Sequence, residues 1–138
     1  MSEVPAGGPA ADAASTVLVV ILADDLIWAT RLDRIVRTAG AVPTMTATLP
    51  AYETALAVCE AAIVDLAARR ADPVAAIAAA AAAGRPVVAV GPHADLAARK
   101  RALAAGADRV FAYSKLHEDG PRTVAAWLGR SRAAAVVR

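Results

Sequence analysis

From residue 17 onward, short apolar runs alternate along the chain with longer segments in which apolar and polar residues recur at helical spacing. Continuous apolar runs rich in β-branched residues are typical of strands buried on both faces of a parallel sheet. The five segments predicted as strands are Val17–Leu22, Ala41–Thr48, Ala61–Val64, Pro86–Val90 and Arg109–Tyr113. Pro43 predicts an edge position for the second strand, because proline cannot donate a ladder hydrogen bond.

After each strand the pattern predicts a helix. The five segments predicted as helices are Leu26–Thr38, 50–60, Pro73–Gly84, Asp95–Ala105 and Asp119–Leu128. Gly40 and Gly106 follow two of them, as glycine often does at a helix C-terminus. Such regular alternation predicts a doubly wound α/β fold, in which a five-stranded parallel sheet carries five helices on its two faces.

Length and composition indicate one compact domain. The chain has 138 residues, and the pattern divides it into a flexible, Pro/Gly-rich leader (1–15), a domain (16–129) and a basic C-terminal tail (130–138). A single cysteine excludes a disulfide framework and a multi-thiolate zinc site. Since we find neither a signal peptide nor an apolar stretch long enough to span a bilayer, we expect a cytoplasmic location and no membrane partner.

Charge and motifs exclude several classes of function. The 15 basic residues nearly balance the 13 acidic ones, and the formal net charge of +2 argues against a dedicated nucleic-acid binder. No glycine-rich phosphate loop follows the first strand, and the chain has neither a G-x-S-x-G elbow nor an H-E-x-x-H motif. We therefore do not expect an enzyme.

Charged residues follow the predicted strands, at the sheet edge where ligands bind in folds of this type. Asp24 and Asp25 follow the first strand, Asp65 the third and Lys115 the fifth. Converging carboxylates repel one another unless a cation joins them, so the three aspartates are candidate ligands for Mg²⁺. A carboxylate beside Mg²⁺ can also attack phosphorus and form an aspartyl phosphate. Alternatively, Asp24 and Asp25 simply cap the helix that follows them.

Three stretches in order resemble the receiver domains of bacterial response regulators. They are VVILADDLI (19–27), AAIVDL (61–66) and PVVAVGPHADLAARKRALAAGADRV (86–110), and the resemblance covers about 17–128. It implies a flavodoxin-like sheet with strand order 2-1-3-4-5. It also implies that Asp65 is the phospho-acceptor, that Mg²⁺ binds beside it, and that Asp72 matches an aspartate in the turn that follows.

The chain departs from the family at the positions that convert phosphorylation into a conformational change. The first of the family's two acids after the first strand is Ala23 here, and its Ser/Thr after the fourth strand is Gly91. The place of its lysine is taken by Tyr113, so Lys115 lies two residues too late unless a bulge absorbs the difference.

Two further positions differ. The family's aromatic switch residue corresponds to Ala112 or, without an insertion, Val110, and its Met-Pro after the phospho-acceptor is replaced by Ala68 and Arg69. We interpret the chain as a degenerate, pseudo-receiver-like signalling module that acts by protein–protein interaction.

The resemblance also implies which surface pairs with partners. This is the surface of the fourth helix, fifth strand and fifth helix, where we expect Arg99, Lys100, Arg109 and an exposed Trp127 to form the interaction face. The expected partners are a histidine kinase, a downstream regulator or a second copy of the chain.

Three alternatives remain open on the sequence. In the first, the chain is a phosphorylatable single-domain regulator, in which Asp65 accepts the phosphoryl group, Asp24 holds Mg²⁺ and Lys115 neutralises charge. In the second, it senses a small molecule or anion in the same cleft without covalent chemistry. In the third, it is a nucleic-acid accessory that binds through its arginines.

Overall fold

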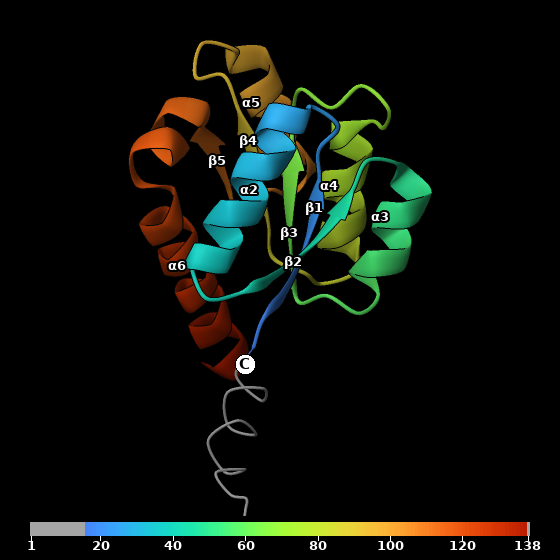
Figure 1. The fold of residues 1–138 in the computed structure, drawn as a ribbon. Helices are drawn as coiled ribbons and strands as arrows, with labels where there is room; N and C mark the ends of the chain where they lie inside the picture. The colour runs from blue at the N-terminus through green and yellow to red at the C-terminus, as the bar shows by residue number, and fades with distance from the viewer. Residues whose placement is uncertain (1–15, 138) are drawn as a thin grey trace, which may run out of the picture.

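Figure 1 presents a computed structural model of the chain, which describes residues 16–137. Five parallel strands form one sheet in the order β2-β1-β3-β4-β5, which confirms the predicted fold class and strand order. The strands are β1 (Leu18–Leu22), β2 (Val42–Thr46), β3 (Ala61–Asp65), β4 (Val87–Gly91) and β5 (Arg109–Ala112). Pro43 lies in the edge strand β2, as predicted. The leader predicted over 1–15 lies outside the described residues.

Helices follow the strands as predicted. They are α2 (Leu26–Thr38), α3 (Leu49–Leu56), α4 (Pro73–Ala82), α5 (Leu96–Ala105) and α6 (Tyr113–Val137). Side chains of Asp25, Thr48, Asp72 and Asp95 cap the first four by accepting a backbone N–H of the first turn. Within residues 16–137, no helix combines the length and the apolar character that crossing a membrane requires.

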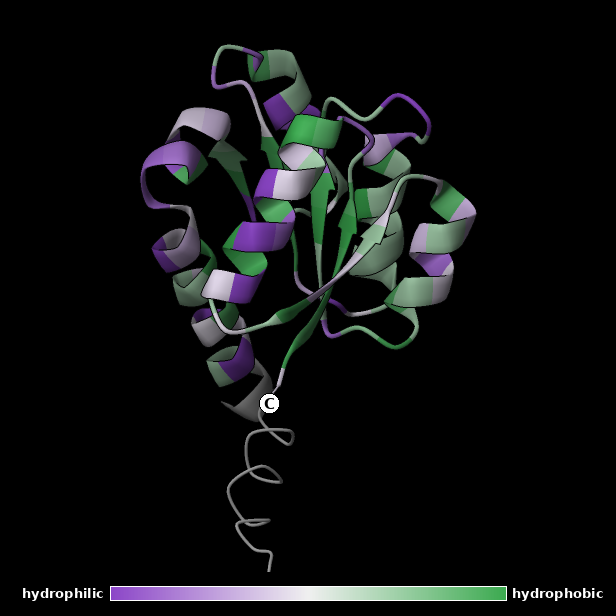
Figure 2. Ribbon diagram, viewed as in Figure 1, coloured by the Kyte–Doolittle hydropathy of each residue, from purple (hydrophilic) through white to green (hydrophobic). Residues whose placement is uncertain are grey.

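The sheet separates two apolar cores. Val19 and Ile21 of β1 pack toward α2 and α6, whereas Val20 and Leu22 pack toward α3, α4 and α5. Successive strand residues point to opposite faces, so a strand covered on both sides must be apolar throughout. Figure 2 shows this pattern, with hydrophobic colours along the central strands and hydrophilic ones gathered on helices and loops.

The last helix begins earlier than predicted, at Tyr113 rather than at Asp119. Asp119 interrupts it with non-helical backbone (φ −147°, ψ 36°), so the predicted start marks the second part of a kinked helix. The first part of α6 is held in place by Leu116, which is buried in the core between the sheet and helices α2 and α6. The helix continues to Val137, so residues 130–137 extend α6.

Trp127 corrects one prediction about the interaction face. Its side chain is only 2% exposed, and its Nε1 donates a hydrogen bond to Asp108 Oδ2 at 3.1 Å. Trp127 lies on the inner side of α6 with Val124 and Leu128, and all three are buried in the core between the sheet and helices α2 and α6. The expectation of an exposed aromatic at this position is therefore wrong, because the helical spacing that groups these residues directs them against the sheet.

Candidate functional site

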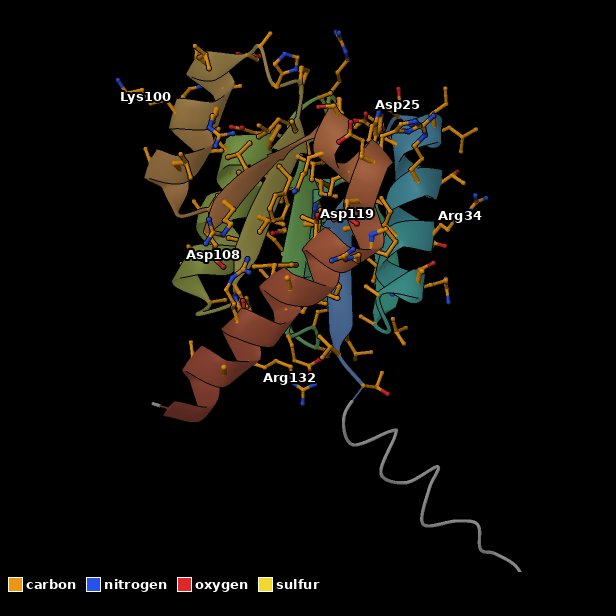
Figure 3. All side chains as sticks on the ribbon, turned by 90° about the vertical axis from the view of Figure 1, so that its left-hand side faces the viewer. Asp25, Arg34, Lys100, Asp108, Asp119 and Arg132 are labelled. Atoms are coloured by element: carbon orange, nitrogen blue, oxygen red, sulfur yellow. The ribbon has the colours of Figure 1, made fainter. Side chains whose placement is uncertain are left out.

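The predicted acidic residues lie at the carboxyl edge of the sheet. Asp65 is the last residue of β3, which lies between β1 and β4, and Asp24 and Asp25 follow β1. Gly91 ends the neighbouring strand β4. Figure 3 labels Asp25 at this edge, above the N-terminal turn of α2. Parallel strands thus bring residues far apart in the sequence to one place, as the fold class predicts.

Asp65 is completely buried, with 0% of its surface exposed. Its Oδ1 accepts hydrogen bonds from the backbone N–H of Ala67, at 3.1 Å, and from the hydroxyl of Tyr113. Its Oδ2 is buried and has no hydrogen-bond partner among the described residues. The carboxyl is thus enclosed by protein and held through one of its two oxygens.

Burial also determines the protonation chemistry of this pair. Removal from water raises the pKa of Asp65, and the hydrogen bonds from Tyr113 and Ala67 oppose only part of that rise. Burial likewise raises the pKa of Tyr113, and the hydrogen bond to Asp65 raises it further. Tyr113 therefore keeps its proton at neutral pH and acts as a neutral donor to the carboxyl.

The ring of Tyr113 is fixed by side chains of α2. It stacks on Trp28, with ring centroids 4.1 Å apart and an interplanar angle of 18°. The guanidinium carbon of Arg31 lies 5.3 Å from the centre of the Trp28 ring, and Arg31 Nη1 is 3.2 Å from His117 Nδ1 on α6. Since Arg31 can only donate, His117 Nδ1 is the acceptor. Together these contacts tie α2 to the first part of α6 and hold the tyrosine over Asp65.

Asp24 and Asp25 serve different local roles. Asp24 Oδ2 accepts the backbone N–H groups of Arg70 and Arg69, both at 2.7 Å, and the bond from Arg70 is the main cause of a lowered pKa for Asp24. Asp25 Oδ1 accepts the N–H of Trp28 at 3.0 Å and caps α2. The capping alternative is therefore confirmed for Asp25, whereas Asp24 organises the loop after β3.

These residues do not fit a Mg²⁺ ion bound by Asp24, Asp25 and Asp65 together. A surface hollow of about 510 Å³ is lined by Asp24, Asp25 and the loop 66–69, but Asp65 does not line it. Among residues 16–137, no three His, Cys, Asp or Glu side chains form a group that could hold a metal ion. The unpaired Oδ2 of Asp65 is therefore enclosed by protein and is not open to the hollow that Asp24 and Asp25 line.

Lys115 does not lie at the edge of the sheet that carries Asp24, Asp25 and Asp65, which we call the acidic edge. The strand β5 ends at Ala112, so Lys115 extends from the first turn of α6 and is exposed. It lines surface hollows together with Arg109 and Phe111, and no contact of Lys115 with Asp65 is present among the described residues. No bulge carries the lysine back to the place where the resemblance expects it. Tyr113 fills that place.

A hydroxyl side chain at Gly91, which the resemblance implies for receiver domains, would press on Leu66. A Cβ added at this position would lie 3.3 Å from both Cβ and Cδ1 of Leu66. That distance is tighter than ordinary van der Waals contact, so Leu66 occupies the volume beside Gly91. The role of Leu66 was not predicted, and neither was the hydrogen bond of Tyr113. One signal in the sequence could have suggested a closed site. It is the apolar Leu66 directly after Asp65, together with Gly91 at the end of the neighbouring strand.

The comparisons with known proteins support the fold. By sequence, the chain matches no protein-family model and no curated protein. By structure, it is similar to the receiver domain of the TMAO respiratory system response regulator TorR, with TM-score 0.72 and 17% identity over 83% of this chain and 98% of that one.

Two further solved structures are similar to the same extent. One is a CheY-like receiver domain protein from Methanospirillum hungatei JF-1 (TM-score 0.70, 19% identity, 87% of this chain and 99% of that one). The other is a response regulator receiver domain protein from Clostridium thermocellum (TM-score 0.72, 9% identity, 88% and 99%). With its five-stranded sheet and its acidic edge, the chain has the fold of response-regulator receiver domains.

Proposed function

We propose that the chain is a receiver-fold signal-transduction module that acts through protein–protein contacts, and that Asp65 is a buried structural carboxyl and not a phospho-acceptor. The hydrogen bond from Tyr113 to a fully buried Asp65 carries this proposal. A carboxylate that attacks phosphorus must present an oxygen to the phosphoryl donor. Here one oxygen is engaged twice, and the other is enclosed.

Among the described residues, neither the lysine nor the hydroxyl that the resemblance implies for stabilising a phosphoryl group lies beside Asp65. Lys115 lies on another surface, and Gly91 is packed against Leu66. A neutral tyrosine hydroxyl cannot offset the charge of a phosphoryl group as an ammonium does. These features support a module without enzymatic chemistry of its own, whose signal passes to a partner protein by docking. We expect such a module to act in the cytoplasm.

The small-molecule alternative has weaker support. The hollow at the acidic edge is lined by two carboxylates, Asp24 and Asp25, against one cation, Arg69, so its charge does not favour an anion. The phosphorylatable alternative instead requires Tyr113 to leave Asp65 and Lys115 to reach it. Both changes require the first part of α6 to rearrange.

An amide NMR titration with Mg²⁺ followed by beryllofluoride, which mimics a phosphoryl group on aspartate, tests the proposal. We expect no saturable shifts near Asp65 in the wild-type chain. We also expect Tyr113→Phe, which removes only the donor hydroxyl, to leave this result unchanged, since Asp65 stays buried. Saturable shifts at Asp65 and Gly91 that spread to β5 would contradict the proposal and favour the phosphorylatable regulator.

Asp65→Asn provides a second readout. If docking is the function, this variant binds its partner with the affinity of the wild type, because the side chain is buried and its shape is preserved. A variant that lost regulated binding, while remaining folded by circular dichroism, would assign Asp65 a switching role.

A further inference from the structure

Basic side chains line two adjoining hollows on the surface formed by α5, β5 and α6, which faces the viewer in Figure 3. The hollows have volumes of about 410 and 470 Å³ and share Arg109, Phe111 and Lys115. We call this surface the basic strip, and its basic residues are Arg99, Arg109, Lys115, Arg122 and Arg130.

The basic strip carries an excess of positive charge. Its two hollows are lined by five basic residues but only two acidic ones, Asp108 and Asp119. Asp108 accepts the indole N–H of Trp127, and Asp119 lies 3.9 Å from Arg122 in a loose ion pair. Within the described part of the chain, no ion pair neutralises Arg109, Lys115 or Arg130. Two of these three, Arg109 and Lys115, line both hollows, so the excess charge is greatest where the hollows meet.

Apolar groups lie among the charges. Phe111 is partly exposed and lines both hollows, and Leu103 of α5 is 43% exposed at one of them. Arg99 Nη1 donates to the carbonyl of Val110 at 3.1 Å and thereby covers part of the outer edge of β5. This arrangement disfavours the addition of another strand at that edge, so side chains and not backbone ladders must recognise a ligand.

The charge of the basic strip indicates which partner it fits. A second copy of the chain docked face to face through this surface would set two positively charged strips against each other, because a two-fold interface uses the same patch on both copies. Juxtaposed like charges disfavour such a contact. A nucleic acid would satisfy the charges, but it would leave the apolar surface of Phe111 and Leu103 without a matching group. A protein segment that carries both carboxylates and an apolar side chain matches both features.

We propose that the basic strip binds an acidic segment of a partner protein, with carboxylates paired to Arg109 and Lys115 and an apolar side chain covering Phe111. This inference rests on the proposed function, since it names the kind of partner that the module contacts. In this proposal Phe111, and not the buried Trp127, is the aromatic residue of the interaction face.

The test measures binding of a fluorescein-labelled, glutamate-rich peptide with one central leucine to the full chain, by fluorescence anisotropy. We expect Arg109→Glu or Lys115→Glu to weaken binding by about tenfold or more, and Phe111→Ala by about threefold. Arg34→Glu makes the same charge change on α2 and serves as the matched control, for which we expect less than a twofold change, on the order of experimental error. Circular dichroism of each variant verifies that it remains folded.

Three outcomes would overturn the inference. Equal weakening by Arg34→Glu and Arg109→Glu would indicate attraction to net charge alone. Tighter binding of a duplex DNA oligonucleotide, unaffected by Phe111→Ala, would indicate a nucleic-acid surface. Concentration-dependent dimerisation in sedimentation, abolished by Arg109→Glu, would assign the basic strip to a second copy. None of these results changes the beryllofluoride titration at Asp65, so this inference and the proposed function fail separately.

Discussion

Tyr113, the first residue of α6, donates its hydroxyl proton to the carboxyl of Asp65, the last residue of β3. Forty-eight residues separate the two along the chain. The contact gives the buried carboxyl of Asp65 a neutral donor and helps to enclose it at the carboxyl edge of the sheet. The behaviour of this pair can be measured through stability as well as through binding.

Asp65→Asn is expected to stabilise the protein at pH values above the folded pKa of Asp65. Because burial raises the pKa of Asp65, the folded chain holds this proton more tightly than the unfolded chain does. Stability is therefore lost as the pH rises through the folded pKa and regained as it falls back through it. Burying an asparagine amide that lacks one hydrogen-bond partner costs less free energy than burying an unpaired charge. We therefore expect the substitution to raise the free energy of unfolding by about 1 kcal/mol or more above that pKa.

Urea unfolding followed from neutral to acidic pH measures this effect. The difference between Asp65→Asn and the wild type should shrink toward acid, where Asp65 is protonated in both states. A variant that is less stable than the wild type across the whole pH range, or a difference independent of pH, would contradict the assignment of Asp65 as a costly buried carboxyl.

Tyr113→Phe is expected to reduce stability by about 1–2 kcal/mol above the folded pKa of Asp65, where it removes a hydrogen bond to a buried carboxylate. The loss should be smaller in an Asp65→Asn background, because the bond to a charged acceptor is the stronger one. A double-mutant cycle on the free energy of unfolding measures this coupling.

The chain offers a matched control in Tyr52. Its hydroxyl is also buried and donates to the carbonyl of Ala76 at 2.8 Å, far from any acidic group of the site. Tyr52→Phe should cost about 1 kcal/mol, less than Tyr113→Phe because the acceptor is neutral, and should show no coupling to Asp65. Equal coupling of both tyrosines to Asp65→Asn would show that the cycle reports a global change and not the contact.

Gly91→Thr is expected to destabilise the fold by about 1–3 kcal/mol, because the new Cβ meets Leu66 at 3.3 Å and the branched side chain adds further volume. Thermal unfolding of the variant measures the loss. Adding Leu66→Ala should recover part of it, so that the two changes are non-additive. Strict additivity would mean that Leu66 does not occupy the space beside Gly91.

Asp24→Ala is expected to loosen the loop after β3 without unfolding the chain. The Asp24 carboxylate accepts the N–H groups of Arg69 and Arg70, so its removal should speed hydrogen exchange at those two amides. The lowered pKa of Asp24 means that its stabilising effect is present above the unfolded pKa and is lost as the pH falls through the folded one. Exchange rates at Arg69 and Arg70 that match the wild type would show that the loop is held by other contacts.

The fold can be predicted from the amino-acid pattern alone, because burial on both faces requires each central strand to be a continuous apolar run. The apolar runs around Val20, Ile63 and Val88 therefore predict the central strands, and Pro43 predicts an edge strand. The same logic placed Asp24, Asp25 and Asp65 at one edge, since the ends of parallel strands converge.

The contacts that those residues make depend on how distant segments pack together, which the pattern does not predict. The Gly-Pro pair at 120–121 resembles a helix start, and local pattern cannot reveal that Leu116 reaches the core and makes 113–118 helical as well. That helical turn directs Lys115 to the basic strip and leaves the hydroxyl of Tyr113 on Asp65. Helical spacing likewise grouped Trp127 with Val124 and Leu128, but their burial depends on what packs against α6. Periodicity is a local property, whereas the contacts of a side chain depend on segments distant in the sequence.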